Sequence, residues 1–145
     1  MILPREGIIN MIRLSSIELV DFKNVEQGTI ALSEWELEDG RLPADIVGIY
    51  GQNGSGKTSI IKALSIFKSV LLGYPVNVEA QDCPSRKTGT CSIGVKGYCF
   101  AEQQTPIWSF SLLIKLAEGH KGDLRIVGER LSCKDLRPEA GGRPM

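Results

Sequence analysis

The stretch Ile46-Val47-Gly48-Ile49-Tyr50-Gly51-Gln52-Asn53-Gly54-Ser55-Gly56-Lys57-Thr58 is the most informative part of this sequence. Residues 51–58 fit the pattern Gly-x-x-x-x-Gly-Lys-Ser/Thr, a phosphate-binding loop that joins a strand to a helix. The apolar residues 46–50 predict the strand. From Ile60 onward, apolar residues recur at helical spacing, which predicts a helix with one buried face. The residues expected on that face are Ala63, Leu64, Phe67, Val70 and Leu71. The neighbours of the loop therefore supply the context that its pattern requires.

Three glycines give the loop the backbone freedom that phosphate binding needs. Gly51, Gly54 and Gly56 let the chain turn with few steric limits, so that successive amides from about Gly54 to Ser59 can point inward at an anion. The helix that follows places the positive end of its dipole at the same point. We therefore expect the loop to enclose the phosphates of a nucleotide.

The side chains of the loop have separate predicted roles. Lys57 would reach the β- and γ-phosphates as a point charge and act in catalysis, and the Thr58 hydroxyl would be a ligand of Mg²⁺. We expect Asn53 near the γ-phosphate and Ser59 near the α-phosphate. The predicted nucleotide-binding residues are Gly51, Asn53, Gly54, Ser55, Gly56, Lys57, Thr58 and Ser59.

Length and charge limit what this loop can accomplish. The chain has 145 residues, the size of one domain with a sizeable core. Lysine plus arginine and aspartate plus glutamate number 17 each, so the overall charge favours neither a nucleic-acid nor a membrane partner.

The cysteines indicate a reducing compartment. Cys83, Cys91, Cys99 and Cys133 form no Cys-x-x-Cys pair, and His120 is the single histidine, so free intracellular thiols are favoured over a zinc site. No uninterrupted apolar run approaches the roughly 18 residues of a membrane span, and the N-terminus lacks the apolar core of a signal peptide. We expect a cytoplasmic protein.

Before the loop, the sequence predicts an extension, two strands and an acidic surface segment. Residues 1–10 have no clear period and precede a second methionine, so we expect them to be disordered or an upstream start. Strand patterns follow at 12–22, in two pieces, and at 29–32. The acidic segment 34–39 is predicted to be a surface loop anchored by Trp35.

After the helix, which Gly73 and Pro75 should end, residues 76–91 predict a loop of low order. Three strands then follow, at 93–100, 108–116 and 124–131, as an antiparallel meander with a bulge at Gly97. In the middle strand, one face should carry Trp108, Phe110, Leu112, Ile114 and Leu116. The Pro/Gly-rich residues 137–145 are expected to be a disordered tail.

This order of parts resembles a known family. The segment 11–25, the loop at 51–58 and the strands that end at Leu131 are similar to the N-terminal lobe of an ABC-type ATPase head. Within that class the chain is most similar to RecF/SMC-like and OLD-like (overcoming lysogenisation defect) ATPases, including AAA-family proteins of abortive-infection systems. The resemblance covers about residues 11–136. It implies ATP as the nucleotide and an α/β (α+β) P-loop NTPase lobe, in which strand, loop and helix join an antiparallel β-meander.

Two motifs of that family are missing from the sequence. No run of four apolar residues ends in Asp-Glu, and Leu131-Ser132-Cys133 shares only two letters with the Leu-Ser-Gly-Gly signature. Gln103 and Gln104 lack the flanking pattern of a γ-phosphate sensor. Because phosphoryl transfer needs positioned metal and water, we expect an incomplete head. It would hydrolyse ATP only with a C-terminal lobe or a second ATPase head, in DNA repair or phage defence.

Other interpretations remain open. The same loop could serve a small-molecule kinase or a GTPase, although the sequence has neither an Arg-rich lid after the helix nor an Asn-Lys-x-Asp guanine motif. The chain could also be a non-catalytic interaction module that keeps the loop as a relic. Lys23 is either a phosphate or base contact, or a solvated lysine beside a core Phe22.

Overall fold

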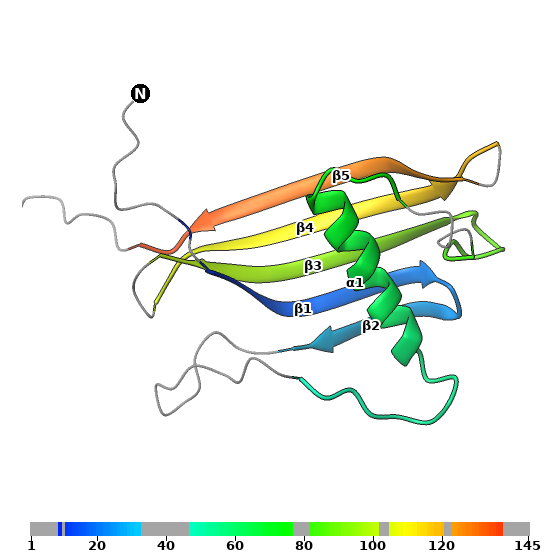
Figure 1. The fold of residues 1–145 in the computed structure, drawn as a ribbon, viewed down its shortest axis with the longest axis horizontal. Helices are drawn as coiled ribbons and strands as arrows, with labels where there is room; N and C mark the ends of the chain where they lie inside the picture. Colours follow the sequence, from blue (N-terminus) through cyan, green and yellow to red (C-terminus); the bar gives the residue numbers. More distant parts are fainter. Residues whose placement is uncertain are drawn as a thin grey trace, which may run out of the picture.

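A five-stranded sheet and one helix make up the described part of the chain (Figure 1). The computed structural model describes residues 9, 11–32, 47–76, 82–101, 105–120 and 123–137. The strand order across the sheet is β2-β1-β3-β4-β5, and every neighbouring pair is antiparallel. The elements are β1 (Met11–Phe22), β2 (Val25–Ala31), α1 (Lys57–Leu71), β3 (Thr90–Phe100), β4 (Pro106–Glu118) and β5 (Leu124–Asp135).

The predicted α/β P-loop lobe is wrong as a fold class. Residues 47–50, which were expected to form the strand that enters the loop, have no strand structure, and residue 46 lies outside the described residues. Every pair of neighbouring strands in the sheet is antiparallel, and no strand of the sheet pairs with residues 47–50. A buried parallel strand needs neighbours that satisfy its backbone groups on both sides. A short run interrupted by Gly48 has no such neighbour among the described residues.

The two predicted pieces of the first strand form a single strand, because a bulge absorbs the break between them. The β1–β3 register shifts between Leu14 and Ser16, so Ser15 is the extra residue. The sequence predicts a bulge at Gly97 on β3. The extra residue lies instead on β1, next to Leu14, which pairs with Gly97. The second strand begins at Val25 rather than at Thr29, so the connection between β1 and β2 is shorter than predicted.

The predicted meander of β3, β4 and β5 is present, and its chain order and pairing are as expected. Trp108 pairs with Cys99 and Leu116 with Cys91, so the apolar residues of β4 follow the alternating face predicted from the sequence. The strand assigned to 124–131 is longer and continues to Asp135.

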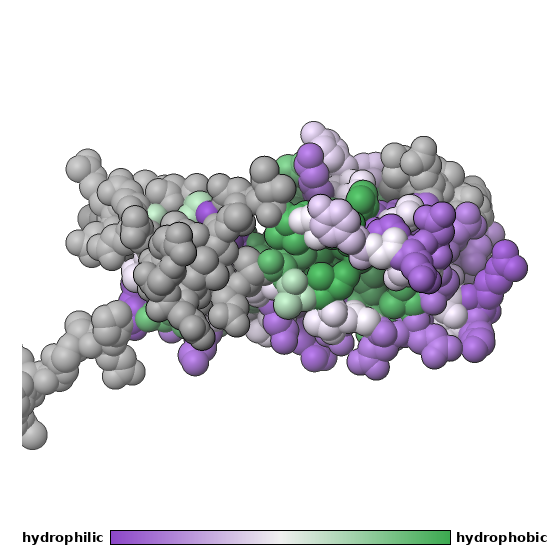
Figure 2. Space-filling model, turned by 90° about the horizontal axis from the view of Figure 1, so that it is seen from below, coloured by the Kyte–Doolittle hydropathy of each residue, from purple (hydrophilic) through white to green (hydrophobic). Residues whose placement is uncertain are grey.

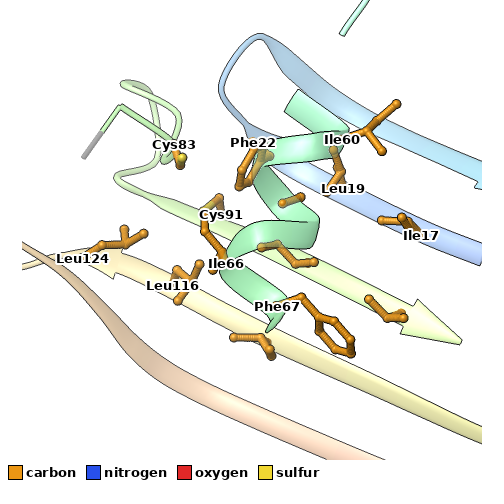
Figure 3. Packing of buried hydrophobic residues seen from close by; sticks show 14 residues of the cluster. Ile17, Leu19, Phe22, Ile60, Ile66, Phe67, Cys83, Cys91, Leu116 and Leu124 are labelled. Atoms are coloured by element: carbon orange, nitrogen blue, oxygen red, sulfur yellow. The ribbon is translucent and has the colours of Figure 1, made fainter. Parts of the chain in front are cut away.

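The core lies between one face of this sheet and one face of α1 (Figure 3). Ala63 has no exposed surface, and Phe67 is 5% exposed, so the helix backbone comes close to the strands. The prediction omitted Ile66, which is buried, and placed Leu71 inside, although it is 61% exposed. Burying each such large side chain stabilises the fold by about 1.5–3 kcal/mol. From the sheet, the core receives Ile17, Leu19, Phe22, Cys91, Ile93, Val95, Ile114, Leu116 and Leu124.

The helix ends where the sequence predicted. Gly73 takes a φ of 71°, and its amide donates to the Val70 carbonyl over 3.0 Å. The Tyr74 amide donates to the Ser69 carbonyl over 2.9 Å. These bonds satisfy carbonyls of the last turn, as a glycine-terminated helix requires.

The side of the molecule near β2 and the start of α1 carries hydrophobic surface (Figure 2). Ile61 on α1 is 64% exposed, and Val47 and Tyr50 before the loop are 48% and 94% exposed. The outer edge of β2 pairs with no other strand among the described residues. No helix in the described part of the chain is long and apolar enough to cross a membrane.

Several sequence predictions fall outside the described residues. They are the extension at 1–10 apart from Ile9, the acidic segment 34–39 with Trp35, the glutamines Gln103 and Gln104, and the tail after Arg137.

Substitution of two isoleucines of α1 tests the packing of the helix. Ile66 is 5% exposed and Ile61 is 64% exposed, so Ile66→Ala should lower the free energy of unfolding by about 2–5 kcal/mol, whereas Ile61→Ala should cost less than about 1 kcal/mol. Urea denaturation followed by circular dichroism measures both. Equal costs for the two variants would contradict the packing of α1 described above.

Candidate phosphate-binding site

The loop between Tyr50 and α1 turns tightly before the helix begins. The Ser55 amide donates to the Gln52 carbonyl over 3.1 Å, which closes the turn. Gly54 and Gly56 have φ angles of 87° and 94°, a conformation that side chains other than glycine rarely adopt. The two glycines therefore serve the backbone role that the pattern assigned to them.

The start of α1 leaves backbone donors unused. Gly56 caps the helix without a side-chain hydrogen bond, and the first turn contains no acidic residue. Within the described residues, no acceptor is recorded for the amides of Gly54 and Gly56, or for those of residues 57–59. The Ile60 amide is the first to bond in helical fashion, to the Gly56 carbonyl over 3.2 Å. Unpaired amides at the positive end of a helix dipole form a binding place for an anion.

The ammonium group of Lys57 lies over the loop itself. It donates to the Gln52 carbonyl over 2.8 Å and also to the Gly51 carbonyl. Both contacts involve exposed groups, so the side chain can leave them at little cost. The positive charge therefore rests on two carbonyls of the loop.

A side chain on the turn between β1 and β2 connects that turn to the loop. The Asn24 amide donates to the Gly54 carbonyl, and the Ser59 hydroxyl donates to the Asn24 side-chain oxygen, each over 3.4 Å. Ser59 is 3% exposed, so its hydroxyl is held inside by this contact. Both bonds are long, so they hold the loop only weakly.

The segment 82–89 forms the opposite wall and is fixed to the end of β1. The Lys23 amide donates to the Cys83 carbonyl over 2.6 Å, and the Ser85 amide donates to the Asp21 carbonyl over 2.9 Å. Asp21 and Lys23 take φ angles of 52° and 55°, which turns the chain out of the strand at this point. The sequence predicts a loop of low order here. Residues 82–89 form no helix or named strand, as expected, but these backbone bonds and the burial of Cys83 hold the segment in place.

An open pocket of about 1100 Å³ lies between the two walls. The β1–β2 turn, the start of α1 and the segment before β3 lie at one end of the sheet (Figure 1), and residues of all three line the pocket. Its basic side chains outnumber its acidic ones, which favours an anionic ligand. The charged lining residues are Lys23, Lys57, Arg86 and Lys87 against Asp82 and Glu118.

The predicted site residues divide into two groups. Asn53, Gly54, Gly56, Lys57, Thr58 and Ser59 line the pocket, whereas Gly51 and Ser55 do not. The sequence analysis missed Asn24 and the basic pair Arg86 and Lys87. Asn24 itself was the available signal for the β1–β2 turn, because asparagine is a common turn residue. No sequence signal placed residues 82–89 beside the loop.

The cysteines and the single histidine form no metal site. All four cysteines are free thiols, and no group of three or more His, Cys, Asp or Glu in the described ranges could hold a metal ion. Burial raises the pKa of the Cys91 thiol to about 12, and burial also raises the pKa of the Cys83 thiol. These thiols therefore act as small apolar residues of the core beneath the pocket wall.

Comparison with protein-family models gave no match, and comparison with curated proteins gave no significant match. Inference about function therefore rests on the geometry of the pocket and on the sequence patterns.

Thiol labelling tests the packing behind the pocket wall. Cys133 is exposed, whereas Cys83, Cys91 and Cys99 are buried with pKa values raised by burial. A thiolate-specific reagent at about pH 8 should modify only Cys133 in the folded protein, and all four cysteines in urea. Labelled peptides identify the sites. Rapid labelling of Cys83 in the folded chain would show that the segment 82–89 is not held as described.

Proposed function

We propose that this chain binds the phosphates of ATP, together with Mg²⁺, through residues 51–59. The observation that carries the proposal is the set of unpaired amides of Gly54 and of residues 56–59 at the start of α1, in a segment that lines a pocket with an excess of basic side chains. Backbone amides in this arrangement can bind phosphate without help from side chains.

Lys57 would bind the β- and γ-phosphates. Its ammonium group lies on exposed carbonyls of the loop, so rotation of the side chain would carry the charge toward an anion held by the neighbouring amides. Asn53 lines the pocket and would lie near the γ-phosphate. Ser59 would contribute its amide near the α-phosphate, since its hydroxyl is buried against Asn24. Lys23 lines the same pocket and would add a second phosphate contact.

Thr58 would be the protein ligand of Mg²⁺. It is exposed in the first turn of α1 and lines the pocket, and its hydroxyl has no recorded partner among the described residues. One protein oxygen suits Mg²⁺, which usually keeps several waters and takes its other ligands from phosphate oxygens. The residues present therefore fit this ion.

Binding and hydrolysis would be divided between this chain and a partner. The carboxylates that line the described part of the pocket are Asp82 and Glu118, and neither follows an apolar run as the general base of this ATPase class does. We propose that a C-terminal lobe or a second ATPase head supplies the catalytic base. Exposed hydrophobic surface beside β2 and α1 supports such a contact.

The sequence resemblance to RecF/SMC-like and OLD-like ATPases supports ATP over other nucleotides. In that setting the assembly would act in the cytoplasm, in DNA repair or phage defence. Because the sheet is antiparallel, the resemblance is limited to the loop, the helix and the antiparallel strands, and does not extend to an α/β lobe.

Removal of the Lys57 charge tests the proposal. Lys57→Ala should weaken ATP binding at least tenfold, about 1.4 kcal/mol, because the ammonium group contacts two phosphates. Titration of labelled ATP measures the affinity, and Lys62→Ala on the same helix is the matched control because it removes an equal charge outside the pocket lining. Equal ATP affinities for wild type and Lys57→Ala would refute nucleotide binding by this loop.

The metal contact is tested separately at Thr58. Mg²⁺ should strengthen ATP binding by the wild type, and Thr58→Val, which keeps the shape but removes the oxygen, should abolish that gain. Thr58→Ser should retain it. The readout is the ratio of ATP affinities with Mg²⁺ and with a chelator. A ratio for Thr58→Val equal to that of the wild type would exclude Thr58 as a metal ligand.

A further inference from the structure

The sheet face opposite α1 is polar and carries no second layer among the described residues. Alternate residues of β1, β3, β4 and β5 point to this face, since their neighbours Ile17, Ile93 and Ile114 are buried against the helix. The strand register arranges these residues in rows across the sheet: Val20, Ser92, Lys115 and Gly128; Glu18, Gly94, Leu113 and Arg130; Ser16, Lys96, Ser111 and Ser132; and Arg13, Tyr98, Ser109 and Lys134. We call this surface the basic face.

The charge on the basic face is one-sided, although the whole chain is neutral. Lys96, Lys115, Arg130 and Lys134 are exposed, and no ion pair involving them is recorded within the described ranges. In the rows given above, Glu18 is the single carboxylate. Because the other acidic residues point elsewhere or lie in other segments, this face presents a positive potential that the net charge does not reveal.

The cations occupy successive rows of the basic face. Successive rows are two residues apart along the strands, about 7 Å at roughly 3.4 Å per residue. Lys115, Arg130, Lys96 and Lys134 fall in consecutive rows, on strands that are β4 itself or its direct neighbours. They therefore form a band that alternates across β3, β4 and β5, here called the track, and a flexible polyanion that crosses it would meet one cation in each row.

The remaining residues of the basic face make it flat and give it one aromatic ring. Small residues occupy much of the rows, including Ser92, Gly94, Ser109, Ser111 and Ser132. Tyr98 lies in the same row as Lys134 and is partly exposed. An aromatic ring beside a track of cations suits an unpaired base next to its phosphates.

We propose that the basic face binds single-stranded nucleic acid, with its phosphates along the track and a base stacked on Tyr98. A duplex hides its bases from Tyr98, and an acidic protein or lipid surface does not need an aromatic ring placed among cations in successive rows. Single-strand binding combines a positive track with stacking on aromatic rings. The proposal is independent of nucleotide binding by residues 51–59, which lie on the other side of the sheet at α1.

The test uses a fluorescent oligo-dT and the full chain. Anisotropy titrations at about 50–200 mM salt should show binding that weakens with salt, and Lys96→Gln/Lys115→Gln should lower the affinity at least fivefold and reduce the salt slope by about 1.4, at about 0.7 per phosphate contact. Lys62→Gln/Lys68→Gln on α1 removes the same charge from the opposite layer and should change neither quantity. Tyr98→Leu should lower the affinity and leave the salt slope unchanged.

Each other result overturns the proposal. No binding at low salt, or equal losses in the two double-lysine variants, would show that the track makes no specific contact. If duplex DNA bound as tightly as oligo-dT, the ligand of the basic face would be a duplex and not a single strand. Stronger binding to anionic vesicles or to a polyglutamate peptide would assign the face to a membrane or an acidic protein. Circular dichroism of each variant confirms that these exposed substitutions leave the fold intact.

Discussion

The packing of one face of α1 on an antiparallel sheet is the interaction on which the other features depend. Ala63 has no exposed surface, so the helix backbone lies close to the strands, and Ile66 and Phe67 fill the space on either side. This contact fixes where the helix begins. The unpaired amides of its first turn therefore point to the same end of the sheet as the turn between β1 and β2.

The pocket exists because backbone hydrogen bonds connect segments that are far apart in the sequence. The end of β1 binds the segment 82–89 through Asp21 and Lys23, and Asn24 reaches the loop from the same turn. The first of these connections is strong and the second is weak. As a consequence, the wall with Arg86 and Lys87 is fixed, whereas residues 51–56 have no strand before them and depend on α1 for their position. A loop held from one side would pay more ordering entropy on binding a ligand than one held from both.

The two faces of the sheet differ in polarity and charge. The inner face is apolar and meets the helix, and the outer face carries four exposed cations against one carboxylate, Glu18, in the rows described. Alternation along each strand places the two sets on opposite sides, so a neutral composition becomes an asymmetric surface. The pocket beside residues 51–59 and the basic face can then act independently, because no side chain belongs to both.

The sequence by itself determined the local features. Gly54 and Gly56 require positive φ, Gly73 ends the helix, and the alternation from Trp108 to Leu116 fixes one face of β4, because each of these follows from the backbone or side-chain period of a few neighbouring residues. Only the tertiary structure decided that residues 47–50 form no strand and that residues 82–89 close the pocket. It also decided that Lys96, Lys115, Arg130 and Lys134 share one face. Those outcomes depend on which strands pair and in which register, and pairing is set by contacts between distant segments that no local pattern records.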